Sequence, residues 1–99
     1  MDFKIILSPL ALADLGEIVR YIAKDDPLAA GRLGNKLLNE ADSLAQLPFR
    51  GSHVRRRPGV RKLLRSPYLI FYRVNETARS VEVLRFWHGA QDERGVRFE

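Results

Sequence analysis

The chain has 99 residues, 45% of them hydrophobic, and a net charge of +5, which suits one compact domain with a modest core. It has no cysteine, so disulfides and thiolate zinc sites are excluded and a reducing cytoplasm is the expected compartment. We find neither a signal-peptide pattern nor a run of about 20 apolar residues that could span a membrane. We therefore expect a single domain over residues 1–99, with the last few residues as a flexible tail.

The first predicted elements are a short strand and an amphipathic helix. Residues 3–7 form an apolar stretch, and Ser8-Pro9 is typical of a helix start, with serine as the N-cap and proline at the first helical position. Apolar residues then recur at helical spacing and predict that the helix ends near Lys24. The predicted apolar stripe of this helix comprises Leu12, Leu15, Ile18, Val19 and Ile22.

A second helix follows after a very short connection. Asp26-Pro27 repeats the capping signal and predicts a helix over residues 28–47, ended by Pro48. Because so few residues separate the two helices, they should form an antiparallel hairpin. The predicted stripe of the second helix comprises Ala30, Leu33, Leu37, Ala41 and Leu44. We expect both stripes to pack against a sheet.

The hydrophobic period changes to two in the second half of the chain. Strands are predicted over residues 60–65, 68–74 and 81–87, with Ser66-Pro67 as a turn or bulge between the first two. On the last strand, Val81, Val83, Arg85 and Trp87 are expected to share one face. The predicted fold class is α+β: a strand, an antiparallel helical hairpin, then a three-stranded antiparallel meander, with the helices packed on one face of the sheet.

Charge is distributed unevenly between the two halves. Residues 1–49 carry a net charge of −2 and residues 50–99 a net charge of +7, and the stretch from Arg50 to Asn75 has eight basic residues and no acid. This asymmetry indicates an anionic partner, or else a solvated basic face. The partner could be RNA, with arginines on phosphates and aromatics stacking on bases. It could equally be an acidic, disordered protein segment that folds on binding.

No constellation of catalytic residues is evident. A nuclease needs a base, an acid and a stabiliser of the charged transition state within hydrogen-bonding reach. The two histidines, His53 and His88, lack metal-ligand spacing, and the acids of the second half are scattered, so we expect no metal and no cofactor. The chain also has no glycine-rich phosphate loop and no nucleophile motif.

Several short motifs occur in a fixed order across residues 3–95, and their combination is more specific than any one of them. They are FKIILSPLALADLGEIVRYIA, the Asp-Pro helix junction, LPFRG, YLIFYRV and VEVLRFWHGAQD. Together they resemble the ParE/RelE superfamily of type II toxin–antitoxin toxins, specifically its ParE branch. The ParE ending is usually close to Val-x-Val-Leu-Arg-Val-x-His-Gly-Ala-Arg-Asp, and Gln91 stands here where arginine is usual.

The resemblance implies one of two activities. RelE-like toxins cleave messenger RNA in the ribosomal A site, whereas ParE-like toxins act on DNA gyrase and block replication. RelE-like enzymes carry two arginines and a C-terminal tyrosine at positions that hold Leu69, Gln91 and Arg97 here. The resemblance therefore implies a gyrase inhibitor with no catalytic residues. A ribonuclease that relies on Arg73 and Lys62 is the alternative, and a non-toxic relative or nucleic-acid-binding module is a third interpretation.

The resemblance also implies partners. Both branches are neutralised by an antitoxin, here ParD-like, whose acidic C-terminal segment folds onto the toxin and whose N-terminal part binds promoter DNA. We expect a hetero-oligomer with this antitoxin, operator binding through the antitoxin, and no direct binding of DNA by this chain. The candidate antitoxin-binding residues are Leu10, Leu12, Val19, Tyr21, Arg57, Arg61, Arg65 and Arg73. The candidate gyrase-binding residues are Arg85, His88, Gln91 and Asp92.

Overall fold

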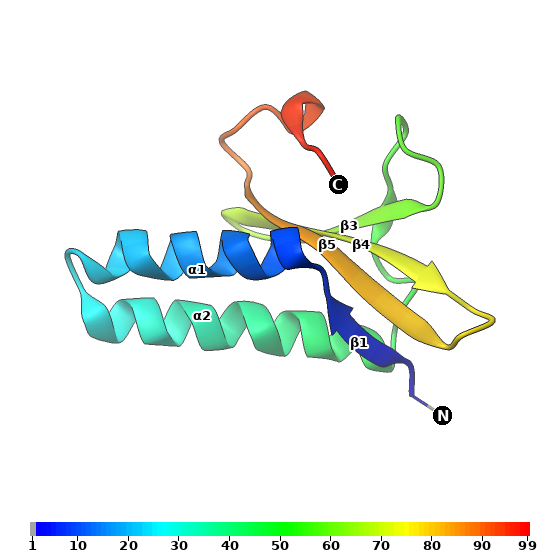
Figure 1. Cartoon of the computed structure of the whole chain (residues 1–99), viewed down its shortest axis with the longest axis horizontal. Helices are drawn as coiled ribbons and strands as arrows, with labels where there is room; N and C mark the ends of the chain where they lie inside the picture. The colour runs from blue at the N-terminus through cyan, green and yellow to red at the C-terminus, as the bar shows by residue number, and fades with distance from the viewer. Residues whose placement is uncertain (1) are drawn as a thin grey trace.

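The structure, a computed structural model, describes residues 2–99 and has two helices packed on one sheet. Its elements in chain order are β1 (Lys4–Leu7), α1 (Pro9–Ala23), α2 (Pro27–Asp42), η1 (Ser43–Ala45), β2 (Ser52–His53), β3 (Val60–Arg65), β4 (Tyr68–Asn75), β5 (Ser80–His88) and η2 (Glu93–Gly95). Figure 1 shows α1 and α2 side by side, with the C-terminal residues on the other side of the sheet from α2. The predicted α+β class is confirmed.

The sheet contains five strands in the order β1-β5-β4-β3-β2. Strands β3, β4 and β5 form the predicted antiparallel meander, and β1 joins it parallel to β5, with residues 4–7 opposite residues 80–83. The two-residue β2 was not predicted. It is held by backbone pairing with Arg61 and Lys62, and two residues are too few to produce an alternating pattern in the sequence.

Both helices begin at the predicted caps. The Ser8 hydroxyl accepts the amide N–H of Ala11 at 3.0 Å, and the Asp26 carboxylate accepts that of Ala29 at 3.0 Å. In each helix proline occupies the first turn, where an amide hydrogen would have no partner. Helix α1 ends where predicted. Helix α2 ends at Asp42, earlier than predicted, because the chain tightens into the 3₁₀ turn η1.

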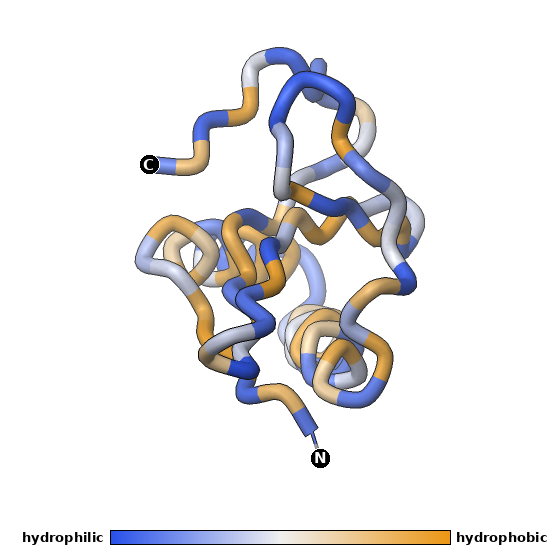
Figure 2. Tube along the Cα trace, turned by 90° about the vertical axis from the view of Figure 1, so that its right-hand side faces the viewer, coloured by the Kyte–Doolittle hydropathy of each residue, from blue (hydrophilic) through white to orange (hydrophobic). Residues whose placement is uncertain are grey.

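The main core lies between the helices and one face of the sheet. Its buried members are Ala11, Leu37, Ala41, Leu44, Leu63, Tyr68, Ile70, Tyr72, Val81, Val83 and Phe86. In Figure 2 hydrophobic and hydrophilic residues alternate along the strands and helices, whereas the loop between β2 and β3 is largely hydrophilic. The predicted stripe of α2 is confirmed. The stripe of α1 is wrong at Leu12, which is 55% exposed because Ala11 takes the buried position beside it.

A smaller apolar cluster covers the opposite face of the sheet. It comprises Val60, Leu69, Phe71, Leu84 and Val96, with Val54, Trp87 and Phe98 packed around them. The Phe98 ring meets Phe71 edge-on at 5.4 Å, and Val96 is 5% exposed. The C-terminal residues, where a flexible tail was expected, therefore fold back onto the sheet because they carry apolar side chains that cover it.

An extra residue in β5 changes which of its side chains share a face. Adjacent residues of β4 pair with Arg85 and Val83, so Leu84 is an additional, bulged residue. Beyond the bulge, Phe86 rather than Arg85 follows Val83 into the main core. The prediction that Arg85 and Trp87 share the face of Val83 is therefore wrong, because strict alternation does not survive a bulge.

Candidate functional site

Arg85 lies where α1 crosses the end of β5. Strand β1 stops at Leu7, so the last part of β5 is left as a sheet edge, and α1 covers it with Asp14. The Asp14 carboxylate accepts bonds from Arg85 Nε at 2.7 Å, Arg85 Nη2 at 2.8 Å and the Phe86 amide at 3.1 Å. The hydrogen bonds from Asp14 raise the pKa of Arg85.

The same guanidinium also reaches the C-terminal residues. Arg85 Nη1 donates to the carbonyl of Arg97 at 2.6 Å, and the side chains of Arg85 and Asp14 are only 15% and 12% exposed. Arg85 therefore joins α1, β5 and the C-terminal segment. Because Asp14 neutralises its guanidinium group, Arg85 presents little uncompensated charge to a binding target. It would contribute to a target-binding surface mainly through its location.

A cavity of about 750 Å³ opens beside this junction, and we call it the α1–β5 cavity. It is lined by Asp14, Glu17, Ile18, Tyr21, Ile22, Tyr68, Arg85, Phe86, Trp87, His88 and Gln91. Three candidate gyrase-binding residues, Arg85, His88 and Gln91, therefore meet in one place. Tyr21, which is 71% exposed and was a candidate for antitoxin binding, lines the same cavity.

His88 and Asp92 organise the turns that follow β5. The Nδ1 atom of His88 accepts the Ala90 amide at 3.0 Å, and its ring lies edge-on to Tyr68 at 5.2 Å. Asp92 caps η2 and binds the Arg94 guanidinium at 2.7 Å, and this hydrogen bonding lowers the pKa of Asp92 to about 2. Asp92 does not line the α1–β5 cavity with the other three candidates.

The apolar candidates for antitoxin binding are not equally accessible. Leu12 and Tyr21 are exposed, whereas Leu10 and Val19 are half-buried. Val19 packs onto α2, where a Cβ added at Gly34 would lie 3.1 Å from Val19 Cγ2. The close approach of the two helices therefore uses Val19, and the surface available to a partner centres on Leu12 and Tyr21.

The basic candidates for antitoxin binding are mostly engaged within the chain. Arg73 pairs with Glu82 at 3.1 Å. Arg61 donates to backbone carbonyls at both ends of residues 49–51, and the Arg57 guanidinium lies 5.3 Å from the Phe98 ring centroid. These residues therefore shape the loops around β3 as well as the electrostatic surface.

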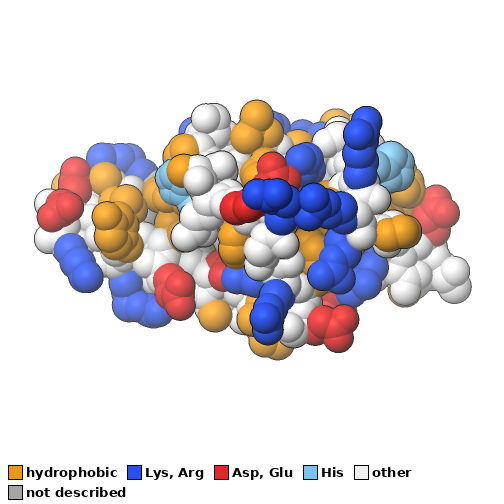
Figure 3. Space-filling model, turned by 90° about the horizontal axis from the view of Figure 1, so that it is seen from above, with side chains coloured by type: hydrophobic (Ala, Val, Ile, Leu, Met, Phe, Trp, Pro, Cys, Tyr) orange, Lys and Arg blue, Asp and Glu red, His pale blue; other side chains and the backbone are white. Residues whose placement is uncertain are grey.

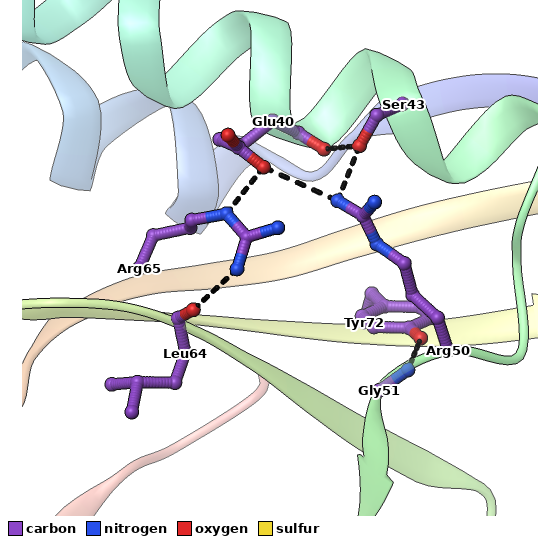
Figure 4. Close-up of polar contacts among 7 residues, drawn as sticks. All are labelled: Glu40, Ser43, Arg50, Gly51, Leu64, Arg65 and Tyr72. Carbon is purple, nitrogen blue, oxygen red and sulfur yellow. Dashed lines mark hydrogen bonds and ion pairs between the residues drawn. The ribbon is translucent and has the colours of Figure 1, made fainter.

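Arg65 belongs to a clamp between α2 and the sheet (Figure 4). Glu40 on α2 forms ion pairs with Arg65 on β3 and with Arg50, which lies 3.2 Å from the carboxylate. Arg50 also donates to the Ser43 hydroxyl. Arg65 is thus tied to the helix, although its side chain remains 33% exposed.

Beside this clamp, Tyr72 secures the chain before β2 (Figure 4). The buried Tyr72 hydroxyl accepts the Gly51 amide at 2.9 Å. Burial raises the pKa of Tyr72, so the hydroxyl stays protonated at neutral pH. A Cβ at Gly51 would lie 2.6 Å from the Tyr72 hydroxyl, so only glycine allows this close approach.

A second cavity, of about 350 Å³, lies on the sheet face opposite the helices, and we call it the basic cavity. Its lining residues are His53, Val54, Arg55, Arg56, Arg57, Lys62, Phe71, Glu93, Arg94, Val96 and Phe98. Sequence reasoning singled out the basic run but missed the contribution of residues 93–98, because nothing local indicates that the C-terminus returns to the sheet. Among residues 2–99 no group of three or more histidines and carboxylates could hold a metal ion. No helix within this part of the chain has the length and apolar character needed to cross a membrane.

Comparison with known proteins decides the family. The model of the ParE toxin of the type II toxin–antitoxin system parDE matches residues 5–93. This chain belongs to the ParE toxin family. It is thus a toxin of the ParE/RelE superfamily, as its motifs predicted. Its sequence is 36% identical over 95 residues to Toxin RelE1 of Caulobacter vibrioides, covering 92% of this chain and 98% of that protein. It is 40% identical over 82 residues to Toxin RelE2 of the same bacterium, covering 82% and 89%.

Solved toxin–antitoxin structures share the fold of this ParE-family chain. The chromosomal ParDE system of P. aeruginosa matches with a TM-score of 0.73 and 23% identity, over 87% of this chain and 95% of that one. The RelBE2 complex of Mycobacterium tuberculosis matches with a TM-score of 0.68 and 24% identity, over 89% and 99%. The two helices on a mixed sheet are therefore the architecture common to both branches of the superfamily.

Proposed function

We propose that this ParE-family toxin acts by binding DNA gyrase and so blocks replication, without cutting RNA. The supporting observation is that uncharged residues occupy two positions at which the ribonuclease branch carries arginine. Leu69 replaces an arginine and is 6% exposed within an apolar cluster, and Gln91 replaces another with an uncharged side chain. Neither residue can stabilise the negative charge that develops when a phosphodiester is cleaved.

The basic residues on which a ribonuclease would have to rely instead, Lys62 and Arg73, are already paired with acids. Lys62 Nζ lies 2.8 Å from Glu93, and Arg73 lies 3.1 Å from Glu82. Arg97 stands where the tyrosine of the ribonuclease branch would fall, and a guanidinium group has no acceptor atom with which to take up a proton. These pairings favour a toxin that works through its surface.

We propose the α1–β5 cavity as the surface that meets gyrase. Tyr21, Tyr68 and Trp87 give it the aromatic character found at the energetic centres of protein interfaces. The antitoxin candidate Tyr21 shares this cavity with the gyrase candidates His88 and Gln91. An antitoxin segment bound to Tyr21 would therefore cover the surface proposed for gyrase. The antitoxin would then neutralise the toxin by competing directly with gyrase for this surface.

The proposed antitoxin is ParD-like, with an acidic C-terminal segment and an N-terminal part that binds operator DNA. The net charge of +7 on residues 50–99 would steer such a segment to the toxin, while Leu12 and Tyr21 would supply apolar contacts. Co-expression with the adjoining antitoxin gene should yield a stable hetero-oligomer. Separate elution of the two proteins at micromolar concentration would argue against this pairing.

A supercoiling assay tests the target. Purified toxin should inhibit gyrase, and Tyr21→Ala or Trp87→Ala should weaken inhibition about tenfold, as expected for the loss of an aromatic interface anchor. Leu47→Ala is the matched control, because Leu47 is 58% exposed and does not line the α1–β5 cavity. Absence of inhibition by the unaltered toxin would refute gyrase as the target.

Ribosome-dependent cleavage of messenger RNA is the alternative function, and one observation favours it. His53, a possible proton-transfer group, lines the basic cavity together with Lys62 and the arginines of residues 55–57. Messenger cleavage in a translation extract, lost on Arg73→Ala or His53→Ala, would support this alternative and contradict gyrase inhibition. No cleavage by the intact toxin would eliminate it.

A further inference from the structure

The α1–β5 cavity differs in charge from the rest of this basic chain. Two carboxylates, Asp14 and Glu17, line it, whereas Arg85 is its single guanidinium group. In Figure 3 lysine and arginine side chains gather over the middle of the face that carries the C-terminal residues, whereas acidic and basic side chains alternate around hydrophobic ones at the end formed by the helical hairpin. With histidine counted as neutral, the cavity therefore has one negative group in excess, in a chain whose net charge is +5.

Glu17 is the carboxylate of this cavity that has no direct partner. The Asp14 carboxylate accepts hydrogen bonds of 2.7 and 2.8 Å from Arg85. Glu17 acts on Arg85 only through space, and its exposed side chain makes no hydrogen bond or ion pair within residues 2–99. The other basic residues at the end of α1, Arg20 and Lys24, do not line the cavity. A cation that enters the cavity therefore meets carboxylate oxygens that no hydrogen bond engages.

Aromatic rings lie beside this carboxylate. Tyr21 follows Glu17 by about one helical turn, so the two side chains lie on the same side of α1. The Tyr21 ring is 71% exposed and makes no aromatic or cation–π contact within residues 2–99. Trp87, from β5, has the Arg85 guanidinium 5.3 Å from its ring centroid, so a planar cation fits against this wall of the cavity. Tyrosine and tryptophan rings attract cations because the faces of the rings carry negative partial charge.

We propose that Glu17 and Tyr21 bind an arginine side chain of the protein target, whose guanidinium group donates to the carboxylate and stacks on the ring. Arginine suits this pair better than lysine does, because its planar fork of donors matches two carboxylate oxygens and its weakly hydrated group stacks on an aromatic face. Arginine is also enriched at the energetic centres of protein interfaces. The proposed antitoxin segment is acidic, so the cation is assigned to the target and not to the antitoxin.

This assignment rests on the proposed function, because it names the chemistry that the α1–β5 cavity would recognise on gyrase. The two can fail separately. Binding of a guanidinium group is measured on the toxin alone, whereas the identity of the target is measured by supercoiling with the unaltered toxin. A toxin that bound arginine in the cavity but left gyrase active would lose gyrase as its target and keep the cation site. A toxin that inhibited gyrase without binding arginine would keep its target and lose this site.

The first experiment titrates the toxin with short peptides and follows the NMR signal of the Trp87 indole N–H. Trp87 is the single tryptophan of the chain, so this signal is unambiguous and reports on the cavity that it lines. The probes are acetyl-Gly-Arg-Gly-amide and its lysine and citrulline counterparts at matched ionic strength, and citrulline keeps the shape of arginine without the charge. The arginine peptide should shift the signal to saturation, the lysine peptide should bind about threefold more weakly, and the citrulline peptide should cause no shift.

Matched variants show which residues bind the cation. Glu17→Gln or Tyr21→Leu should weaken binding of the arginine peptide about threefold, the size expected for the loss of an exposed ion pair or cation–π contact. The control Glu76→Gln removes the same charge from an exposed position between β4 and β5 and should change binding less than about 1.5-fold. In the supercoiling assay, Glu17→Lys should weaken inhibition about tenfold because lysine repels the arginine of the target, whereas Glu76→Lys should leave inhibition unchanged.

Binding of the arginine peptide that is weakened by Glu17→Gln and kept in Glu76→Gln supports the site. The absence of a shift with the arginine peptide would overturn it, as would an equal shift with the citrulline peptide. Equal weakening in the Glu17 and Glu76 variants would also overturn it, because that result marks a net-charge effect. Lysine binding as tight as arginine binding would refute the assignment to arginine. Gyrase inhibition that is unchanged in Glu17→Lys would refute the role of this carboxylate in binding the target.

Discussion

Replacing Asp14 by alanine should destabilise the toxin strongly, although Asp14 lies near the protein surface. Its carboxylate accepts three hydrogen bonds, two from Arg85 and one from the Phe86 amide. Alanine would leave the Arg85 guanidinium, which is 15% exposed, without its counter-ion, and the edge amide of Phe86 without a partner.

The size of the effect follows from this geometry. Removing one partner of a buried ion pair costs about 3–5 kcal/mol, and the residual exposure of this pair places Asp14→Ala at the lower end, about 3 kcal/mol. Asp14→Asn should cost about 2 kcal/mol, because the amide keeps one acceptor but turns a donor toward other donors. Adding Arg85→Met to Asp14→Ala should recover about 1–2 kcal/mol, because the uncompensated charge disappears.

Urea denaturation followed by circular dichroism measures these differences. With a denaturant dependence of about 1.5 kcal/mol per molar urea, a loss of 3 kcal/mol lowers the midpoint by about 2 M. Asp25→Ala is the matched control, since Asp25 is exposed and makes no side-chain hydrogen bond within residues 2–99. If Asp14→Ala shifts the midpoint no more than Asp25→Ala does, the junction contributes no stability and the reasoning fails.

Three further predictions concern turns and caps. Tyr72→Phe should cost about 1–2 kcal/mol because the Gly51 amide loses its buried acceptor, and an unchanged thermal midpoint would contradict this. Gly51→Ala should cost about 2–3 kcal/mol, since its Cβ would lie 2.7 Å from the Lys62 carbonyl oxygen, and a melting curve like that of the unaltered toxin would show that the backbone can yield. Asp92 should titrate by NMR near pH 2, and Arg94→Gln should move its midpoint toward 3.8. Because the folded-state pKa is lowered, the support that ionised Asp92 gives to its turn is complete above about pH 4 and is lost as the pH falls through about 2, and a midpoint near 3.8 before substitution would refute this assignment.

Features set by neighbouring residues were predictable from the sequence. Ser8-Pro9 and Asp26-Pro27 specify helix starts through contacts within one turn, and the structure has both caps. The motifs across residues 3–95 identified the superfamily because they occur together and in order along the whole chain. The bulge at Leu84 was not predictable, because its position depends on how β5 fits both β1 and β4.

The candidate site was harder to predict than the fold, because its side chains find partners far along the chain. Arg85 was expected to meet a target, yet its carboxylate partner lies 71 residues away in α1. Arg65 on β3 likewise forms an ion pair with Glu40 on α2. The sequence alone does not indicate whether a basic residue will find an acidic partner after folding: Arg65 forms an ion pair with Glu40, whereas Arg55 forms none within residues 2–99.

The parallel pairing of β1 with β5 governs when the toxin can exist as a folded protein. Residues 4–7 can pair only after residues 80–83 have been synthesised, and α1 packs on the same strand, β5. The helical hairpin therefore has no complete sheet to pack against until synthesis is nearly finished. Pairings between distant segments form late, since the closure of a long loop precedes any gain from contact. Toxicity is therefore expected only of a chain whose synthesis has passed β5, and the α1–β5 cavity proposed for the antitoxin forms at the same stage. A chain cut short before residue 80 would lack the strand on which β1 and α1 pack, and we expect it not to be toxic.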